Sequence, residues 1–281
     1  MELLTIFTPT YNRKEKIKIL YESLKNQTCK DFVWLIVDDG SVDDTAGYIE
    51  SISEDASFRI EYFYQENRGK SNAHNKGVEL TKTPLFTCVD SDDYITSECV
   101  EKIKEKWKTK GIGDIGILAF CSQTKVSPSF PTSSIRLKEA YEKYKLKGDT
   151  MLVYESSAIS QFRFPSFPNE KFVPENYLYD LLDQVGTLLV LPYVLYIREY
   201  CSDGYTRNMG KLIKNNPQGY EAYISQRIKI DKGIKQLYLD TIRHIAILKV
   251  IGKGILPYVK HKVIALLAYP FGLLLYIKRY R

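Results

Sequence analysis

The sequence has few cysteines and no close pair of them. Its five cysteines are odd in number, stand far apart along 281 residues and form no CxxC motif. Secreted disulfide frameworks use even numbers of cysteines, and zinc sites use closely spaced pairs. We therefore expect reduced thiols in a cytosolic compartment. The N-terminal stretch MELLTIFTPTYN has no charged segment followed by a long apolar core, so we expect the protein to stay in the cytoplasm.

Long apolar runs and internal repeats are also missing. An apolar stretch near the C-terminus, residues 263–277, is only fifteen residues long and is interrupted by Pro270 and Gly272. A helix that spans a membrane needs about 20 apolar residues. The length and the 44% hydrophobic content allow either one large α/β domain or one domain with an appendage.

Charge is distributed unevenly. The formal net charge is +6, but residues 206–281 contain 15 Lys and Arg against 3 Asp and Glu, and residues 1–205 contain 25 against 31. A basic tail of this kind predicts contact with an anionic surface. Nucleic acid is disfavoured, because the basic residues alternate with long aliphatic runs and do not form a polar groove lined with aromatic residues.

The first hundred residues alternate short apolar runs with amphipathic stretches. This pattern predicts βα units and an α/β fold with a mostly parallel sheet flanked by helices. We expect strands at residues 3–8, 32–37, 60–64 and 85–89. Helices are expected around residues 17–24, after a capping box at Ser41 and Asp44, over residues 136–147 and after Pro174. An apolar stripe at residues 234, 237, 238, 242 and 245 predicts a further helix.

Each predicted strand is followed by a polar segment: TPTYNR, DDGSVDD, ENRGKSN and DSDDY. Ligands of open α/β sheets bind at the carboxyl ends of the strands, so these four segments should converge. The last one crowds Asp90, Asp92 and Asp93 into four positions. Like charges this close need a cation, hydrogen bonds or solvent to relieve them. A divalent metal site is one interpretation, and an acidic helix N-terminus is the other.

The segments TPTYN (8–12), VDDGSVDDT (37–45), ENRGKSNAHNKG (66–77) and CVDSDDY (88–94), in this order and spacing, resemble the family 2 inverting glycosyltransferases of bacterial surface-polysaccharide type. The resemblance covers residues 1–95 strongly and residues 96–206 loosely. It implies a GT-A fold, a nucleotide-sugar donor and a Mg²⁺ or Mn²⁺ cofactor. We expect a GT-A domain over residues 1–205, with nucleotide-sugar binding in 1–95 and the acceptor side in 96–205. A basic, helical, membrane-associating region should follow over 206–281.

The resemblance also implies roles for single residues. Asp92 would ligate the metal, Asp90 would lie near both metal and ribose, and Asp93 would belong to the outer shell. Asp39, in preference to Asp38, would accept the N3–H of a uracil ring. Further donor-site residues are Thr8, Pro9, Tyr11, Gly69, Lys70, His74 and Ser91.

Three of these further donor-site residues have specific expected roles. Tyr11 is expected to stack on the base, and Lys70 to share the phosphate charge. His74 stands where the family often has arginine, which leaves the choice of nucleotide open between UDP and others such as dTDP.

The catalytic base is harder to place. Inversion needs a carboxylate near the acceptor hydroxyl, and many relatives carry Glu-Asp at a helix start, with the aspartate as base. This sequence has Pro174-Glu175-Asn176, and asparagine cannot act as a base. Glu175 therefore inherits the role, and Asp180 is the alternative. Glu175 could also serve only as a favourable charge at the helix N-terminus.

The sequence lacks the QxxRW motif and the spanning helices of processive family members. We therefore expect transfer of one sugar to a saccharide acceptor. Basic residues at positions 260, 262, 278, 279 and 281 flank the apolar tail, which suggests a peripheral anchor on the inner face of the cell membrane and a lipid-linked acceptor. A buried core helix or a self-associating bundle, and so a homo-oligomer, is the alternative for the tail. A non-catalytic carbohydrate- or membrane-binding protein is the alternative for the whole chain.

Overall fold

The computed structural model describes residues 2–199, 205–230, 233–255 and 261–281. Lys260, which we expected to flank the apolar tail, therefore lies outside the described residues. The chain divides into two compact units. The sheet unit comprises Met1–Arg163 and Leu178–Cys201, and the helical unit comprises Phe164–Tyr177 and Ser202–Arg281. Each unit is described by itself below.

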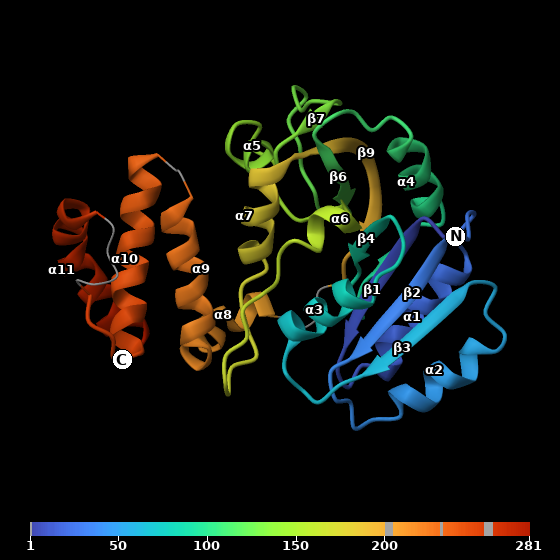
Figure 1. Ribbon diagram of the computed structural model, residues 1–281, viewed down its shortest axis with the longest axis horizontal. Helices are drawn as coiled ribbons and strands as arrows, with labels where there is room; N and C mark the ends of the chain where they lie inside the picture. Colours follow the sequence, from blue (N-terminus) through green and yellow to red (C-terminus); the bar gives the residue numbers. More distant parts are fainter. Residues whose placement is uncertain (1, 200–204, 231–232, 256–260) are drawn as a thin grey trace. The chain divides into compact units, whose positions relative to one another are not determined.

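One mixed sheet organises the sheet unit (Figure 1). In its parallel half, β1 (Leu4–Thr10) lies between β2 (Phe32–Asp38) and β4 (Leu85–Cys88), and β3 (Arg59–Tyr64) pairs with β2. Beyond β4 follow β8 (Thr150–Glu155), β6 (Asp114–Cys121), β9 (Thr187–Ile197) and β5 (Tyr94–Ile95), with β7 (Ser134–Ile135) beside β9. Strand β8 is antiparallel to both β4 and β6. The predicted α/β class is confirmed, and the antiparallel insertion is the feature that its pattern did not indicate.

The helices of the sheet unit are α1 (Lys14–Lys25), α2 (Thr45–Ser53), α3 (Lys70–Leu80), α4 (Cys99–Trp107), α5 (Leu137–Glu142) and α6 (Ser156–Ile159). Helix α7 (Asn176–Val185) belongs to the sheet unit from Leu178 onward. Helix α5 is shorter than the predicted range 136–147. The predicted capping box before α2 is wrong. Helix α2 starts at Thr45, its N-cap Asp44 makes no side-chain capping bond, and the hydroxyl of Ser41 instead accepts the backbone N–H of Asn12 at 2.8 Å.

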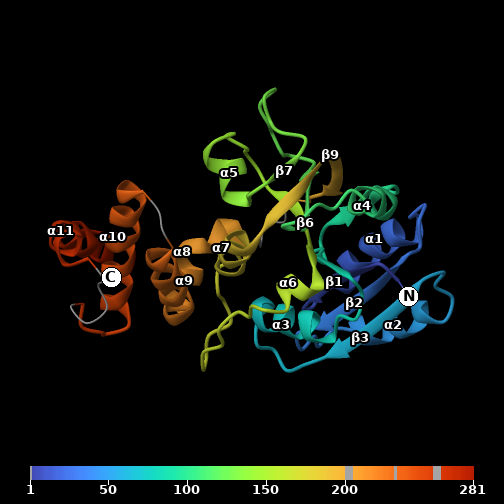
Figure 2. The same cartoon turned by 45° about the horizontal axis from the view of Figure 1, so that its top comes forward.

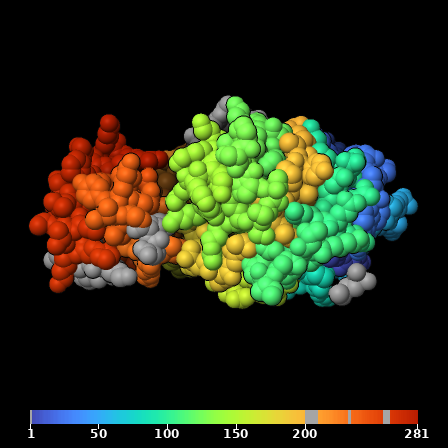
Figure 3. Space-filling model, turned by 90° about the horizontal axis from the view of Figure 1, so that it is seen from above, coloured from blue at the N-terminus to red at the C-terminus, as the bar shows by residue number. Residues whose placement is uncertain are grey.

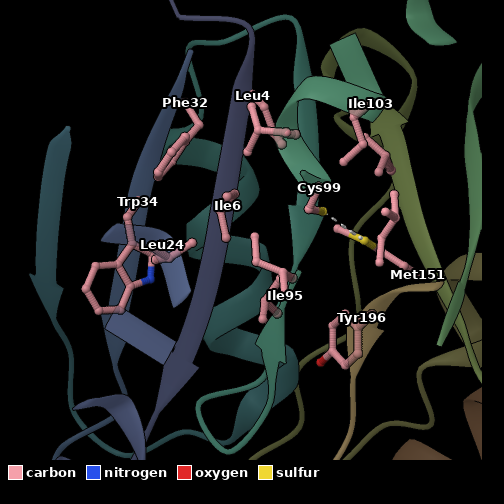
Figure 4. Packing of buried hydrophobic residues seen from close by; sticks show 14 of the residues in the cluster. Leu4, Ile6, Leu24, Phe32, Trp34, Ile95, Cys99, Ile103, Met151 and Tyr196 are labelled. Atoms are coloured by element: carbon pink, nitrogen blue, oxygen red, sulfur yellow. Dashed lines mark hydrogen bonds between the residues drawn. The ribbon is translucent and has the colours of Figure 1, made fainter. Parts of the chain in front are cut away.

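The sheet carries helices on both faces, which is why strand β2 is a continuous run of buried residues (Figure 2). Along β1, Leu4 and Ile6 join the cluster formed with α1, α2 and α4. Figure 4 shows this cluster, in which Cys99 Sγ lies 3.8 Å from Met151 Sδ. On the other face, Phe7 packs beneath α3, where a Cβ added to Gly77 would approach its ring to 2.5 Å. This close packing fixes α3, whose N-terminus borders the polar segment after β3.

The helical unit contains α8 (Tyr205–Asn215), α9 (Pro217–Lys229), α10 (Ile234–Val250) and α11 (Lys262–Arg279). Helix α10 packs between α9 and α11. The face that it buries is partly polar: Asp240 is fully buried and forms ion pairs with Arg227 at 3.0 Å and Arg243 at 2.8 Å. The predicted apolar stripe matches this face only in part, since Ile234 is 76% exposed and Ile245 is buried.

The segment 164–177 belongs to the helical unit because it is bonded to α9. The carboxylate of Glu170 accepts the backbone N–H groups of Gln218 at 2.9 Å and Gly219 at 2.8 Å. These are donors in the first turn of α9, where a carboxylate is favourable. At the other end of the segment, Gln226 donates to the carbonyl oxygen of Tyr177 at 2.8 Å.

Candidate functional site

The four polar segments leave the parallel half of the sheet at one edge. Thr10, at the end of β1, is in register with Asp38, at the end of β2, and Asp38 is in register with Tyr64, at the end of β3. Strand β4 ends at Cys88, opposite Phe7 of β1. Parallel strands with aligned ends place the following loops side by side. The sequence therefore brings residues 11–13, 39–44, 65–69 and 89–93 to the same edge.

The first two loops are bonded to one another. Asn12 donates its backbone N–H to Ser41, and its side-chain oxygen accepts the N–H of Val42 at 2.8 Å. Asn12 has a φ of 51°, a left-handed conformation that asparagine tolerates better than most residues. Gly40 has a φ of 87°, and a Cβ there would lie 2.8 Å from the backbone nitrogen of Asn67. The second loop thus approaches the third through a position that only glycine fits.

Asp39 links the second loop to the third. The side chain is 5% exposed. Its Oδ1 accepts the side-chain amide of Gln65 at 2.7 Å and the N–H of Arg68 at 2.9 Å, and its Oδ2 accepts the N–H of Gly69 at 2.7 Å. A carboxylate has about four acceptor positions, so Oδ2 retains capacity for one further donor. Asp39 is therefore held in a fixed orientation, and these three bonds leave one acceptor position of its carboxylate unused.

Asp38 faces different partners. Its carboxylate accepts the N–H of Ser41 and the hydroxyl of Tyr62, each at 2.7 Å. Burial and this hydrogen bond raise the pKa of Tyr62 well above its usual value, so the tyrosine remains a donor. Asp38 is 1% exposed and holds the ends of β2 and β3 together.

The fourth loop gathers the acidic cluster. Oxygen atoms from the carboxylates of Asp90, Asp92 and Asp93 all lie within 4.8 Å of one another. The ammonium group of Lys70 lies 2.6 Å from Asp90, and the guanidinium of Arg13 lies 3.9 Å from Asp92. Hard divalent cations such as Mg²⁺ and Mn²⁺ prefer carboxylate oxygens. The cluster fits such an ion, with the half-exposed Asp90 and Asp92 as the accessible pair.

Asp93 is held by the end of strand β9. Its Oδ2 accepts the hydroxyl of Tyr196 at 2.8 Å, and its Oδ1 accepts the N–H of Glu199 at 2.9 Å. The same tyrosine oxygen accepts the N–H of Asp90 at 3.1 Å, and the Arg198 guanidinium lies 3.9 Å from the carboxylate of Asp93. Burial raises the pKa of Asp93 to about 6. Asp93 therefore positions the loop.

Sequence reasoning missed the contribution of residues 196–199. These residues lie about a hundred positions after the acidic cluster, and their strand reaches it through pairing of β9 with β5 and β6. No motif marks them. The local sequence YIRE reads as the end of an apolar strand, and only the tertiary pairing shows that its tyrosine and backbone face the acidic loop.

The residues expected to surround the nucleobase of the donor differ in the solvent exposure of their side chains. Thr8 is fully buried, and its hydroxyl accepts the indole N–H of Trp34 at 3.0 Å. Its side chain is thus engaged in the core, and any contact with a nucleotide would come from its backbone. Pro9 and Ser91 are buried as well. Tyr11 is 46% exposed, which leaves its ring available for stacking.

His74 lies on the buried side of α3, within the packing beneath the sheet. Its ring meets the rings of Phe7 and Phe86 edge-on, at centroid distances of 5.6 Å and 5.3 Å. Burial, assisted by the charges of Lys70 and Arg163, lowers the pKa of His74 to about 3. The imidazole is therefore neutral near pH 7 and brings no positive charge toward a phosphate. A nucleotide contact by this residue stays a prediction.

The two candidates for the catalytic base belong to different compact units. Glu175 is exposed and directly precedes α7, in the segment bonded to α9. Asp180 is half-buried within α7 and belongs to the sheet unit. Their assignment as base and alternative stays a prediction.

Comparison with known proteins agrees with this fold. The family model of glycosyl transferase family 2 matches residues 5–167, more than half of the chain. A Campylobacter jejuni GalNAc(5)-diNAcBac-PP-undecaprenol beta-1,3-glucosyltransferase is 25% identical over 179 residues, which cover 61% of this chain and 56% of the relative. The glycosyltransferase GlyA of Streptococcus pneumoniae is 35% identical over 103 residues, 37% of this chain and 15% of GlyA. The chain thus matches only part of the length of these relatives.

Solved structures show the same architecture. TarS 1-349 of S. aureus in complex with UDP-GlcNAc has a TM-score of 0.57 at 15% identity, covering 99% of this chain and 92% of that one. The mannosyltransferase PcManGT of Pyrobaculum calidifontis, in complex with GDP-Man and Mn²⁺, has a TM-score of 0.57 at 12% identity, covering 98% and 86%. The predicted GT-A fold is confirmed. With the family model, the sheet and the strand-end loops in agreement, the chain belongs to glycosyl transferase family 2.

Proposed function

We propose that the protein transfers one sugar from a UDP-sugar, with inversion, to a lipid-linked saccharide acceptor in polysaccharide biosynthesis, at the inner face of the cell membrane. The observation that carries this proposal is the joining of the strand-end loops. One loop presents a preset carboxylate, Asp39, and another presents the acidic cluster of Asp90, Asp92 and Asp93. A nucleoside diphosphate offers a base at one end and a charged group at the other, which suits this pair of features.

The acidic cluster supports the diphosphate end of the donor. Asp92 and Asp90 would hold Mg²⁺ or Mn²⁺, and Asp93 would keep their loop in place through its bonds to β9. A bound divalent cation would neutralise the charge that develops on the departing nucleoside diphosphate. Lys70, already 2.6 Å from Asp90, is placed to share that charge.

Asp39 supports binding of the nucleobase end of the donor. Its remaining acceptor position on Oδ2 suits the N3–H that uracil and thymine carry and cytosine lacks. TarS is solved with UDP-GlcNAc and PcManGT with GDP-Man, so the shared fold does not choose the nucleotide. Asp39 suits uracil and thymine equally. We favour a UDP-sugar, as in the TarS complex, and keep a dTDP-sugar as the alternative.

Activation of the acceptor hydroxyl requires a catalytic base. In an inverting transfer, a carboxylate takes the proton of the acceptor hydroxyl as its oxygen attacks the anomeric carbon from the face opposite the nucleotide. We assign this role to Glu175, which is exposed at the start of α7, and keep Asp180 as the alternative. The lipid-linked acceptor is proposed because the name of the C. jejuni relative states a diphospho-undecaprenol acceptor, and because the C-terminal region is basic.

A screen of nucleotide-sugar hydrolysis with Mn²⁺ tests the proposal. We expect slow release of UDP from one UDP-sugar, and loss of this release with EDTA. Preference for a dTDP-sugar would correct the nucleotide. Binding of UDP without turnover of any sugar nucleotide, with or without saccharide acceptors, would favour the non-catalytic binding protein instead.

A further inference from the structure

Helix α11 exposes a second apolar face in addition to the one that it packs. Six large apolar residues of this helix are between 54% and 76% exposed: Val263, Leu266, Leu267, Phe271, Leu274 and Ile277. At ~100° per residue their spacing places them in one stripe about 140° wide. We call this set the α11 apolar face. In the space-filling view the atoms of α11 (red) form an exposed surface beside those of α10 (orange) (Figure 3).

The packing of α11 within its own unit is already provided by the opposite side. Ala268 and Gly272 are buried, and a Cβ added to Gly272 would lie 2.5 Å from Cγ2 of Ile245 on α10. At the edge of the α11 apolar face, the ring of Phe271 also meets Tyr238 at a centroid distance of 6.4 Å. The helix therefore satisfies the packing of its unit and still presents apolar side chains to the outside.

The length and composition of the helix limit what can cover this face. None of the helices in the described residues is long and apolar enough to cross a membrane, and α11 contains Pro270 in its interior. A helix with one apolar stripe and charged ends can lie in the plane of a bilayer interface. Lys262 stands at its first position, and Lys278 and Arg279 stand in its last turn.

Charge distinguishes a lipid surface from a second copy of the chain. Residues 241–281 contain eight Lys and Arg and no Asp or Glu. Two copies joined through this face would bring these like charges together, whereas an anionic bilayer would attract them. We propose that the α11 apolar face inserts into the interface of an anionic bilayer, with the helix parallel to the membrane plane. This deepens the proposed function and rests on its membrane-bound acceptor.

The test uses the full chain and vesicles of phosphatidylglycerol or of phosphatidylcholine. Leu266 and Leu274 are replaced together by Gln, which removes apolar surface at positions that are 76% and 61% exposed. Ile112→Gln is the control, because Ile112 is a fully exposed apolar residue that lies in a turn of the sheet unit. We expect the double variant to lower partition onto phosphatidylglycerol by about tenfold or more, and the control to leave it unchanged.

A reporter shows whether the side chains enter the lipid. Leu274→Trp should give a blue-shifted emission with anionic vesicles and should be quenched by lipids brominated in their chains. Partition of the parent chain should fall as salt rises, because the electrostatic part is screened. Circular dichroism of each variant checks that its helices are kept.

Three results would overturn the proposal. The double variant could sediment like the parent chain. The parent chain could bind phosphatidylcholine equally well at all salt concentrations. It could also ignore vesicles and form a dimer that the double variant dissociates, which would make the face a contact between copies. Hydrolysis of the sugar nucleotide, measured on the same samples, separates the outcomes, since its absence with intact lipid binding counts only against the proposed function.

Discussion

Replacing His74 by leucine should remove a pH dependence of stability that its burial creates. The imidazole packs edge-on against Phe7 and Phe86, and its pKa is lowered from 6.5 to about 3, mainly by burial. A base with a lowered pKa in the folded state stabilises the fold above its unfolded pKa. That stability is lost as the pH falls, because the unfolded chain takes up the proton and the folded chain does not.

The magnitude follows from the two pKa values. Linkage predicts that the histidine lowers the free energy of unfolding by about 2 kcal/mol as the pH falls from about 7.5 to about 5. Leucine has a similar volume and no titrating group, so the variant should lack this component whatever its overall stability. Asp93, whose pKa is raised to about 6, changes the free energy of unfolding with pH in the opposite direction. Its contribution cancels in the difference between the parent and the variant, because both proteins contain it.

Urea unfolding followed by tryptophan fluorescence measures this difference. The two tryptophans of the chain, Trp34 and Trp107, both lie in the sheet unit, so the signal reports the unit that contains His74. EDTA keeps metal binding out of the comparison. Equal pH dependence in the parent and the His74→Leu variant would refute the reasoning. It would mean that the ring reaches solvent or the ligand site, as a nucleotide-contacting residue would.

Two further predictions concern the acceptor and the acidic loop. Glu175→Gln should leave UDP binding intact and lower transfer by about 10²-fold or more, and Asp180→Asn should do much less; steady-state kinetics of the two variants would show the reverse order if Asp180 is the base. Tyr196→Phe should weaken Mn²⁺-dependent UDP binding by about tenfold, because it removes the hydroxyl that joins Asp93 to the backbone of Asp90. Calorimetry that finds the parent affinity in this variant would dismiss the positioning role.

Strands β1, β2 and β4 of the parallel half could be predicted from the sequence because they are buried on both faces. Such strands read as unbroken apolar runs, as in FVWLIV, and the polar residues that follow mark the strand ends. The acidic cluster and Asp39 could be located for the same reason. The orientation of these carboxylates could not be predicted. For Asp39 it depends on the N–H groups of Arg68 and Gly69, and for the acidic cluster it depends on residues of β9.

The helical unit was less predictable because apolar spacing does not show which polar residues find partners. On α10 the side that is buried includes Asp240 and His244. The structure tolerates this because Arg227 and Arg243 pair with the aspartate, and Glu221 lies 3.0 Å from the histidine. Buried charges are tolerated only when such partners are present, and a single sequence does not reveal these partners.

Calorimetric titration of UDP with and without Mn²⁺, on the parent chain and on Asp92→Asn, tests the central claim most directly. Asp55→Asn is the matched control, since Asp55 is exposed in the turn between α2 and β3, away from the strand-end loops. We expect Mn²⁺ to raise the affinity of the parent and the control for UDP by about tenfold or more. Asp92→Asn should abolish this gain, because a neutral amide is a poor ligand for a hard cation. An equal gain in Asp92→Asn, or no binding of UDP by the parent chain, would contradict the assignment of the nucleotide-sugar site.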